Sequence, residues 1–188
     1  MDQITVLGIA GSLRTGSFNR SALAAAQELA PDEMQIIAFD KLGEIPLYNE
    51  DVKARGFPAP VAELRAAIAK ADALLFVTPE YNFSVPGVLK NALDWVSRPP
   101  DMPLIGKPAT VMGASPGLMG TVRAQLHLRQ ILSGLNMPLL NRPEVLIREA
   151  GNKFDAAGRL ADEDTRKHIR TLLERLLDWT RLIKGGRR

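Results

Sequence analysis

The chain has 188 residues, of which 46% are hydrophobic, so it can bury a sizeable core and has the composition of a soluble globular domain. A formal net charge of only +3, with acidic residues interleaved among the basic ones, argues against a nucleic-acid-binding protein. The absence of cysteine excludes disulfides, thiolate metal sites and a thiol nucleophile, and two histidines are too few for a multi-histidine metal centre.

Apolar runs and amphipathic segments alternate from the start of the chain. Residues 4–11, ITVLGIAG, form a continuous apolar run that ends in glycine, the pattern of a strand covered on both faces. An alanine-rich helix is predicted at 19–30 and a second strand at 34–39. Residues 40–58 then form a long irregular stretch, and a loop of that length in a compact domain is usually functional or part of an interface.

The same alternation continues to the end of the chain. The further predicted elements are a helix at 59–72, a strand at 73–78, a helix at 88–96, a strand at 107–115, a helix at 121–136, a strand at 143–147 and a last helix with the apolar stripe Ile169, Leu172, Leu173, Leu176 and Leu177. About five strands alternating with helices predict one α/β domain over residues 1–188, built on a doubly wound parallel sheet with helices on both faces.

Ligands of such sheets bind outside the carboxyl ends of the strands, near the point where the strand order reverses. The loops after the first, third and fourth strands are therefore the candidate site, and all three have unusual sequences. The first, GSLRTGSFNR at residues 11–20, follows a buried strand with abruptly polar residues. It is not a Walker A loop, because Ser17 stands where that motif needs lysine, and Gly8 and Gly11 lack the spacing of a dinucleotide loop.

A cradle for a single phosphate fits this first loop better. Ser12 and Ser17 offer hydroxyls, Asn19 an amide, and Arg14 a charged fork suited to a phosphate dianion. Backbone N–H groups and the dipole at the start of the following helix favour an anion at the same place. The alternative is that Ser17 only caps that helix while Arg14 is solvated, since capping and phosphate binding use the same groups.

The second candidate loop is PEYNFSVPG, residues 79–87. Its two prolines stiffen the chain, and Tyr81, Asn82 and Phe83 stand where a strand opens into the expected cleft. A planar cofactor needs a rigid wall and backbone donors more than it needs acids or nucleophiles. An ordinary strand-to-helix loop with buried aromatics is the alternative, but Glu80 and Asn82 would be costly there without hydrogen bonds, which favours a ligand.

Together, GSLRTGSFNR and PEYNFSVPGVLKNALDWVSRP resemble the NADPH-dependent FMN reductase family of flavodoxin-like proteins, in particular its soluble bacterial quinone and chromate reductases. The likeness extends to SPGLMGTVRAQLHLRQIL and NRPEVLI, so it covers most of the chain. Both motifs in this order and at this spacing are highly specific. The resemblance implies a flavodoxin-like fold and bound FMN, in a homodimer or homotetramer with the flavin near the subunit interface.

The resemblance also implies a role for particular residues. It implies that the FMN phosphate and ribityl chain are held by Ser12, Arg14, Ser17, Phe18 and Asn19. It further implies that Pro79, Glu80, Tyr81 and Asn82 line the isoalloxazine ring, which Ser115 and Gly117 approach from the third loop.

The implied reaction is reduction of FMN by NADPH or NADH, followed by electron transfer to a quinone or another small acceptor such as chromate, an azo compound or free flavin. No catalytic side chain is then required, because the flavin carries the chemistry. Tyr81 is a conceivable proton donor, with a packing role as the competing interpretation. Two alternatives remain, a flavodoxin-like electron carrier and a flavin-binding regulatory module. Carriers are usually acidic, so the slightly basic balance counts against the first.

Other features complete the expectations. His127 and His168 lie within helical patterns, which favours surface or packing roles over catalysis. Trp95 and Leu126 are expected to be exposed apolar residues on helices beside the site, and with the long loop at 40–58 they predict a homo-oligomer. The first residues lack a basic leader region, and their apolar run is too short to span a membrane, so a cytoplasmic protein is expected. Residues 184–188 form a basic tail that could be disordered.

Overall fold

The computed structural model describes residues 3–186 and contains the expected five-stranded parallel sheet. Its strands are β1 (Ile4–Ala10), β2 (Met34–Phe39), β3 (Ala73–Val77), β4 (Ala109–Ala114) and β5 (Val145–Ile147). They lie side by side in the order β2-β1-β3-β4-β5, and every neighbouring pair is parallel. The strand order therefore reverses between β1 and β3, which is the flavodoxin-like arrangement.

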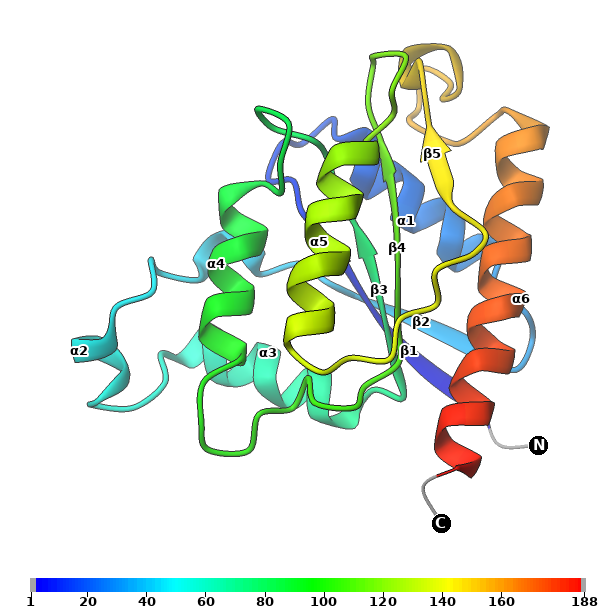
Figure 1. The fold of residues 1–188 in the computed structure, drawn as a ribbon. Helices are drawn as coiled ribbons and strands as arrows, with labels where there is room; N and C mark the ends of the chain where they lie inside the picture. The colour runs from blue at the N-terminus through cyan, green and yellow to red at the C-terminus, as the bar shows by residue number, and fades with distance from the viewer. Residues whose placement is uncertain (1–2, 187–188) are drawn as a thin grey trace.

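Helices cover both faces of this sheet (Figure 1). The structure places α1 (Phe18–Glu28), α2 (Glu50–Lys53), α3 (Ala59–Lys70), α4 (Gly87–Val96), α5 (Val122–Gly134) and α6 (Glu163–Gly185), with short 3-10 turns at Leu42–Glu44 and Ala150–Asn152. One buried cluster joins α1 and α6 to the sheet, and a second joins α3, α4 and α5 to its other face. The doubly wound prediction is thus confirmed.

The burial of each element follows its sequence pattern. All five residues of β3 are buried, as a continuous apolar run in a central parallel strand predicts, whereas the edge strand β2 alternates between buried and exposed residues at its start. The five-residue apolar stripe predicted for the last helix is entirely buried against the sheet.

The long segment after β2 forms an arm that carries α2 away from the body of the molecule (Figure 1). Its base is fixed by Trp95, whose indole N–H donates to the backbone oxygen of Pro46 at 2.8 Å and whose ring meets the edge of Tyr48 at 5.0 Å. Trp95 is completely buried, so its predicted exposure is wrong, because the arm folds over it. Leu126 is exposed as predicted, and Leu47 on the arm is 84% exposed.

The C-terminal helix runs further than the sequence suggested. Lys184 and Gly185 belong to α6, and the Lys184 ammonium lies 2.5 Å from a carboxylate oxygen of Asp72. The expectation of a disordered tail is therefore wrong for these two residues, while residues 187 and 188 lie outside the described part of the chain. Among the helices of residues 3–186, none combines the length and apolar composition that a membrane crossing requires.

Candidate functional site

Three loops meet at the carboxyl end of the sheet, at the top of Figure 1: residues 11–17 after β1, 78–86 after β3 and 115–121 after β4. The first two come into direct contact at Gly11. A Cβ atom at Gly11 would lie 3.2–3.3 Å from Pro79, Pro86 and Leu89, so a larger residue would push these neighbours outward by a few tenths of an ångström. The sequence-predicted loops therefore form one region at the β1/β3 switch point.

The first loop presents a row of free hydrogen-bond donors. Within the described residues, the backbone N–H groups of residues 12–18 donate no hydrogen bond. The Arg14 guanidinium makes no ion pair there either, and it lies 5.7 Å from the centre of the Phe18 ring, folded over the loop. Seven free amides beside one unpaired cation and a helix N-terminus are the groups that bind a single phosphate.

The two serines of this loop are buried. Ser17 is the N-cap of α1, and its hydroxyl accepts from the N–H groups of Asn19 and Arg20 at 3.2 and 3.4 Å. The Ser12 hydroxyl lies 3.5 Å from the Tyr81 hydroxyl of the second loop. The capping role weighed from the sequence is thus present, and it leaves the Ser17 hydroxyl hydrogen free to donate.

The Asn19 side chain is hydrogen-bonded to the backbone of β4. Its amide group donates to the carbonyl of Ala114 and accepts from the N–H of Ala114, both at 2.9 Å, and the side chain is buried. Pairing between β3 and β4 ends with the Thr78 N–H bond to Met112, so Asn19 takes the place of a neighbouring strand two residues further along. Asn19 ties α1 to the end of β4 through one N–H and the oxygen of its amide, and these two bonds leave the second amide N–H for the phosphate contact expected of it.

Phe18 also serves packing. Its half-buried ring stacks on Phe154 at 5.5 Å between ring centres, which fixes the start of α1 against the segment before α6. Phe154 itself carried no signal in the sequence, because an isolated aromatic residue in an irregular segment does not indicate its partner.

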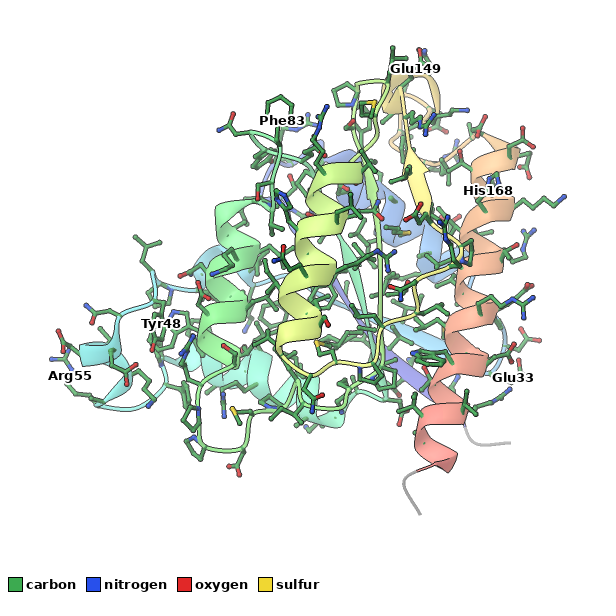
Figure 2. All side chains as sticks on the ribbon, in the orientation of Figure 1. Glu33, Tyr48, Arg55, Phe83, Glu149 and His168 are labelled. Carbon is green, nitrogen blue, oxygen red and sulfur yellow. The ribbon has the colours of Figure 1, made fainter. Side chains whose placement is uncertain are left out.

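The second loop is a tight two-residue turn. Tyr81 and Ser84 exchange two backbone hydrogen bonds of 3.0 and 3.1 Å, and both central residues, Asn82 and Phe83, have positive φ angles of 49° and 65°. Asparagine tolerates this conformation, whereas phenylalanine there costs on the order of 1 kcal/mol or more. Figure 2 shows Phe83 at the tip of this turn.

Glu80, one residue before this turn, is bound to α5. Its carboxylate accepts from the backbone N–H groups of Arg123 and Ala124 at 2.9 and 3.1 Å and from the Arg123 guanidinium at 2.9 Å. Only 11% of the Glu80 side chain is exposed. Its hydrogen bonds are satisfied by the protein, so the burial cost of Glu80 does not by itself require a ligand.

Two further contacts to this loop were missed at the level of sequence. The Arg123 guanidinium lies over the Phe83 ring at 4.3 Å, and the Ser84 hydroxyl lies 3.0 Å from Nδ1 of His127. Both partners lie on the first two turns of α5. Their position at the start of a helix after a candidate loop was the available signal, but helical spacing alone could not show which loop they face.

The third loop is held by the Ser115 side chain and by the backbone of the segment after β5. The Ser115 hydroxyl accepts from the Gly117 N–H at 3.3 Å, and the Gly117 carbonyl accepts from the N–H of Glu149 at 3.2 Å. Ser115 and Gly117 thus sit beside β5, at the same end of the sheet as the other two loops. The remaining sequence-predicted residues, Pro79 (buried) and Asn82 (exposed), lie in the second loop.

Two surface hollows lie near the carboxyl end of the sheet, and only one of them adjoins any of the three loops. One of about 240 Å³ adjoins the first loop and is lined by Ser12, Leu13, Arg20 and the segment after β2. A larger hollow of about 670 Å³ lies between β5 and α6, lined by residues 142–148 and four residues of α6 that include His168, which is labelled in Figure 2. None of the three loops lines it, so it is not part of the candidate site.

The parallel sheet in the order 2-1-3-4-5, with a row of free hydrogen-bond donors at its switch point, defines a flavodoxin-like flavin-binding protein. The model of the family described as "NADPH-dependent FMN reductase" matches residues 4–152, and the chain belongs to this family. Because FMN carries one phosphate, the free amides of residues 12–18 and the Arg14 guanidinium fit this cofactor.

Individual members of known function are similar to this chain over nearly its whole length. An NAD(P)H-dependent FMN reductase of Pseudomonas aeruginosa is 56% identical over 184 residues, which cover 98% of this chain and 99% of that protein. A quinone reductase of Escherichia coli is 44% identical, covering 89% of this chain and 90% of that one. The solved structure of FerB, an NAD(P)H:(acceptor) oxidoreductase of Paracoccus denitrificans, superposes with a TM-score of 0.86 at 36% identity, covering 94% of this chain and 97% of that one.

The chain is therefore an FMN-dependent NAD(P)H oxidoreductase. Bound FMN supplies the redox chemistry, and the protein supplies orientation, electrostatics and shielding. Within residues 3–186, no group of three or more His, Cys, Asp or Glu side chains is placed to hold a metal ion. What these residues can do is hold an anion at the first loop and a flat ring against the second.

Proposed function

We propose that the FMN phosphate binds to the free amides of residues 12–18, with Ser12, Ser17 and Arg14 as side-chain donors. The unpaired row of N–H groups is the observation that carries this placement. Pro79, Tyr81 and Asn82 line the isoalloxazine ring, and Ser115 and Gly117 approach it from the third loop. Phe18, Asn19 and Glu80 act through the scaffold, and the second amide N–H of Asn19 is left for the phosphate.

The electron acceptor that we propose is a quinone. NAD(P)H and one proton reduce it to the hydroquinone, and NAD(P)+ is released, so two electrons and two protons reach the quinone in each turnover. Exposed apolar side chains on the three loops support an apolar, planar acceptor: Leu13, Tyr81, Phe83, Leu118 and Met119. The Escherichia coli relative is named a quinone reductase. Chromate, azo compounds and free flavin are further acceptors to assay.

Two measurements test cofactor and reaction. Calorimetric titration of the apoprotein with FMN, FAD and ATP should show binding of FMN alone, and tight ATP binding without flavin binding would refute the cradle. Steady-state oxidation of NADPH and of NADH with a quinone, without any added protein, should show turnover. An electron carrier or a regulatory module would bind FMN and show none.

Arg14 provides the sharpest test of the phosphate position. Arg14→Ala removes a charge-assisted hydrogen bond of roughly 1.5–3 kcal/mol, so FMN should bind about ten- to a hundredfold more weakly. Arg14→Lys should recover only part of this loss, because an ammonium group lacks the forked geometry. The apoprotein should melt as the wild type does, since Arg14 is exposed. An unchanged FMN dissociation constant in Arg14→Ala would show that the phosphate lies elsewhere.

We also propose a homo-oligomer, a dimer or a tetramer, in the cytoplasm. The projecting arm after β2, on which Leu47 is exposed, supports an interface, because a segment of this length in a compact domain is usually functional or part of an interface. Light scattering of the FMN-loaded protein at micromolar concentration should give a multimer, and Leu47→Asp should weaken it. The lack of cysteine is compatible with a reducing compartment, which cell fractionation can test.

A further inference from the structure

The loop that carries Tyr81 and Asn82 is attached at both of its ends to one helix. Before the turn, the Glu80 carboxylate accepts hydrogen bonds from the backbone N–H groups of Arg123 and Ala124. After the turn, the Ser84 hydroxyl lies 3.0 Å from the His127 ring. All these partners are on α5, so the position of the loop follows the position of this helix.

Glu80 replaces a capping residue that α5 lacks. The N-cap residue of α5, Thr121, makes no capping hydrogen bond with its own side chain, and its hydroxyl is engaged by the side chain of Gln125 at 3.1 Å. The N–H groups of the first turn therefore donate to a carboxylate from another part of the chain. The positive end of the helix dipole and the Arg123 guanidinium both attract this carboxylate.

The turn itself needs such support. Two successive residues with positive φ angles, one of them Phe83, form a conformation that an isolated loop would leave for a less strained one. The Arg123 guanidinium, already paired with Glu80, covers the Phe83 ring at 4.3 Å. Glu80 thus fixes the backbone just before the strained turn, and its partner covers the turn from outside.

From this geometry we infer that Glu80 is a positioning residue, which holds the ring-lining turn in its flavin-binding conformation by anchoring it to the N-terminus of α5. Because the ring is placed against this turn by the proposed function, the inference rests on that function. If loss of the anchor leaves the turn correctly formed about a tenth of the time, FMN binds about tenfold more weakly.

Glu80→Gln tests the anchor, because the amide keeps the size of the side chain but loses the charge and one acceptor. Asp162→Asn is a matched control: Asp162 is the N-cap of α6, accepts from the Thr165 N–H at 2.9 Å and pairs with Lys153 at 2.8 Å, and neither partner belongs to the three loops. Both variants should lower the melting temperature of the apoprotein. Only Glu80→Gln should weaken FMN binding about tenfold and shift the visible spectrum of bound FMN toward that of the free cofactor.

Arg123→Ala separates the helix anchor from the ion pair. It removes the guanidinium but keeps both backbone N–H groups that Glu80 accepts, so FMN should bind within about threefold of the wild type. If Glu80→Gln binds FMN as the Asp162→Asn control does, Glu80 only stabilises the fold and the inference is wrong. If Arg123→Ala loses as much affinity as Glu80→Gln, the Arg123 guanidinium, through the ion pair or its contact with Phe83, holds the turn rather than the helix N-terminus, which also overturns the inference.

Hydrogen exchange in the wild-type protein keeps the test decisive should Glu80→Gln fail to fold. Coupling between the two sites is reciprocal, so FMN binding should slow exchange of the Arg123 and Ala124 amides, while the Thr165 amide at the start of α6 should not change. Equal exchange of the first two amides with and without FMN would refute the coupling. Failure of the wild type to bind FMN would instead refute the proposed function.

Discussion

Asn19 lies in the phosphate loop by sequence but serves the sheet in the structure, and Asn19→Ala should therefore cost stability. The substitution removes two buried hydrogen bonds of 2.9 Å and leaves the N–H and the carbonyl of Ala114 without these partners. A hydrogen bond contributes about 1 kcal/mol net, and an unsatisfied buried group costs about 1–3 kcal/mol. The expected loss is about 2–5 kcal/mol in the free energy of unfolding of the apoprotein.

Thermal and urea unfolding of the apoprotein measure this loss. For a chain of 188 residues, each kcal/mol lowers the melting temperature by about 2–4 °C, so a fall of about 4–20 °C is expected. Gln27→Ala is the matched control, because Gln27 also joins α1 to the sheet but makes a single bond, to the Ile36 carbonyl at 3.1 Å. It should cost about 1 kcal/mol.

Asn19→Asp tests the donated bond separately from the accepted one. The carboxylate can accept from the Ala114 N–H but has no donor for the Ala114 carbonyl, so its stability should be no better than that of Asn19→Ala. If Asn19→Ala melts within 2 °C of the wild type or no lower than Gln27→Ala, the structural role is refuted. Loss of FMN affinity without any loss of stability would show that Asn19 contacts the phosphate directly.

Three further predictions concern the scaffold. Gly113→Ala should destabilise the protein by about 3 kcal/mol or more, or prevent folding, because the new Cβ atom would lie 2.2 Å from the backbone oxygen of Thr78; melting of the purified variant measures it. A hydrogen bond from Lys153 is the main cause that lowers the pKa of Asp162 from 3.8 to about 2, so the stabilisation by this carboxylate should be complete above about pH 4 and lost as the pH falls toward 2. The stability gap between wild type and Asp162→Asn in urea should close over that range. Trp95→Phe should lose about 1–3 kcal/mol and loosen the arm after β2, which limited proteolysis would show as faster cleavage there.

The fold followed from the sequence because its signals are local and repeated. Strand, helix and loop patterns recur five times, and hydrophobic periodicity within each segment determines which residues are buried. The region of the site was predictable for a related reason: parallel strands bring their carboxyl ends to one edge, so loops far apart in sequence must meet there.

The roles of single side chains were less predictable, because they depend on partners distant in sequence. Asn19 bonds to Ala114, and Glu80 bonds to α5, more than forty residues away in each case. A polar residue in a candidate loop looks the same in sequence whether a ligand or the scaffold satisfies it. Trp95 was misjudged for the same reason, since only the course of the arm shows that it is covered.

The placement of Glu80 also suits the chemistry of a redox cofactor. A flavin that accepts electrons gains negative charge, so an uncompensated carboxylate beside its ring would oppose reduction. Here the Glu80 charge is directed away from the turn, onto the guanidinium of Arg123 and the positive end of the α5 dipole. In the proposed site, the turn then presents backbone groups and the side chains of Tyr81 and Asn82 to the ring, while the charge of the anchoring carboxylate is paired with Arg123. An acidic residue in a flavin-lining loop is thus compatible with electron transfer because its charge is paired within the scaffold.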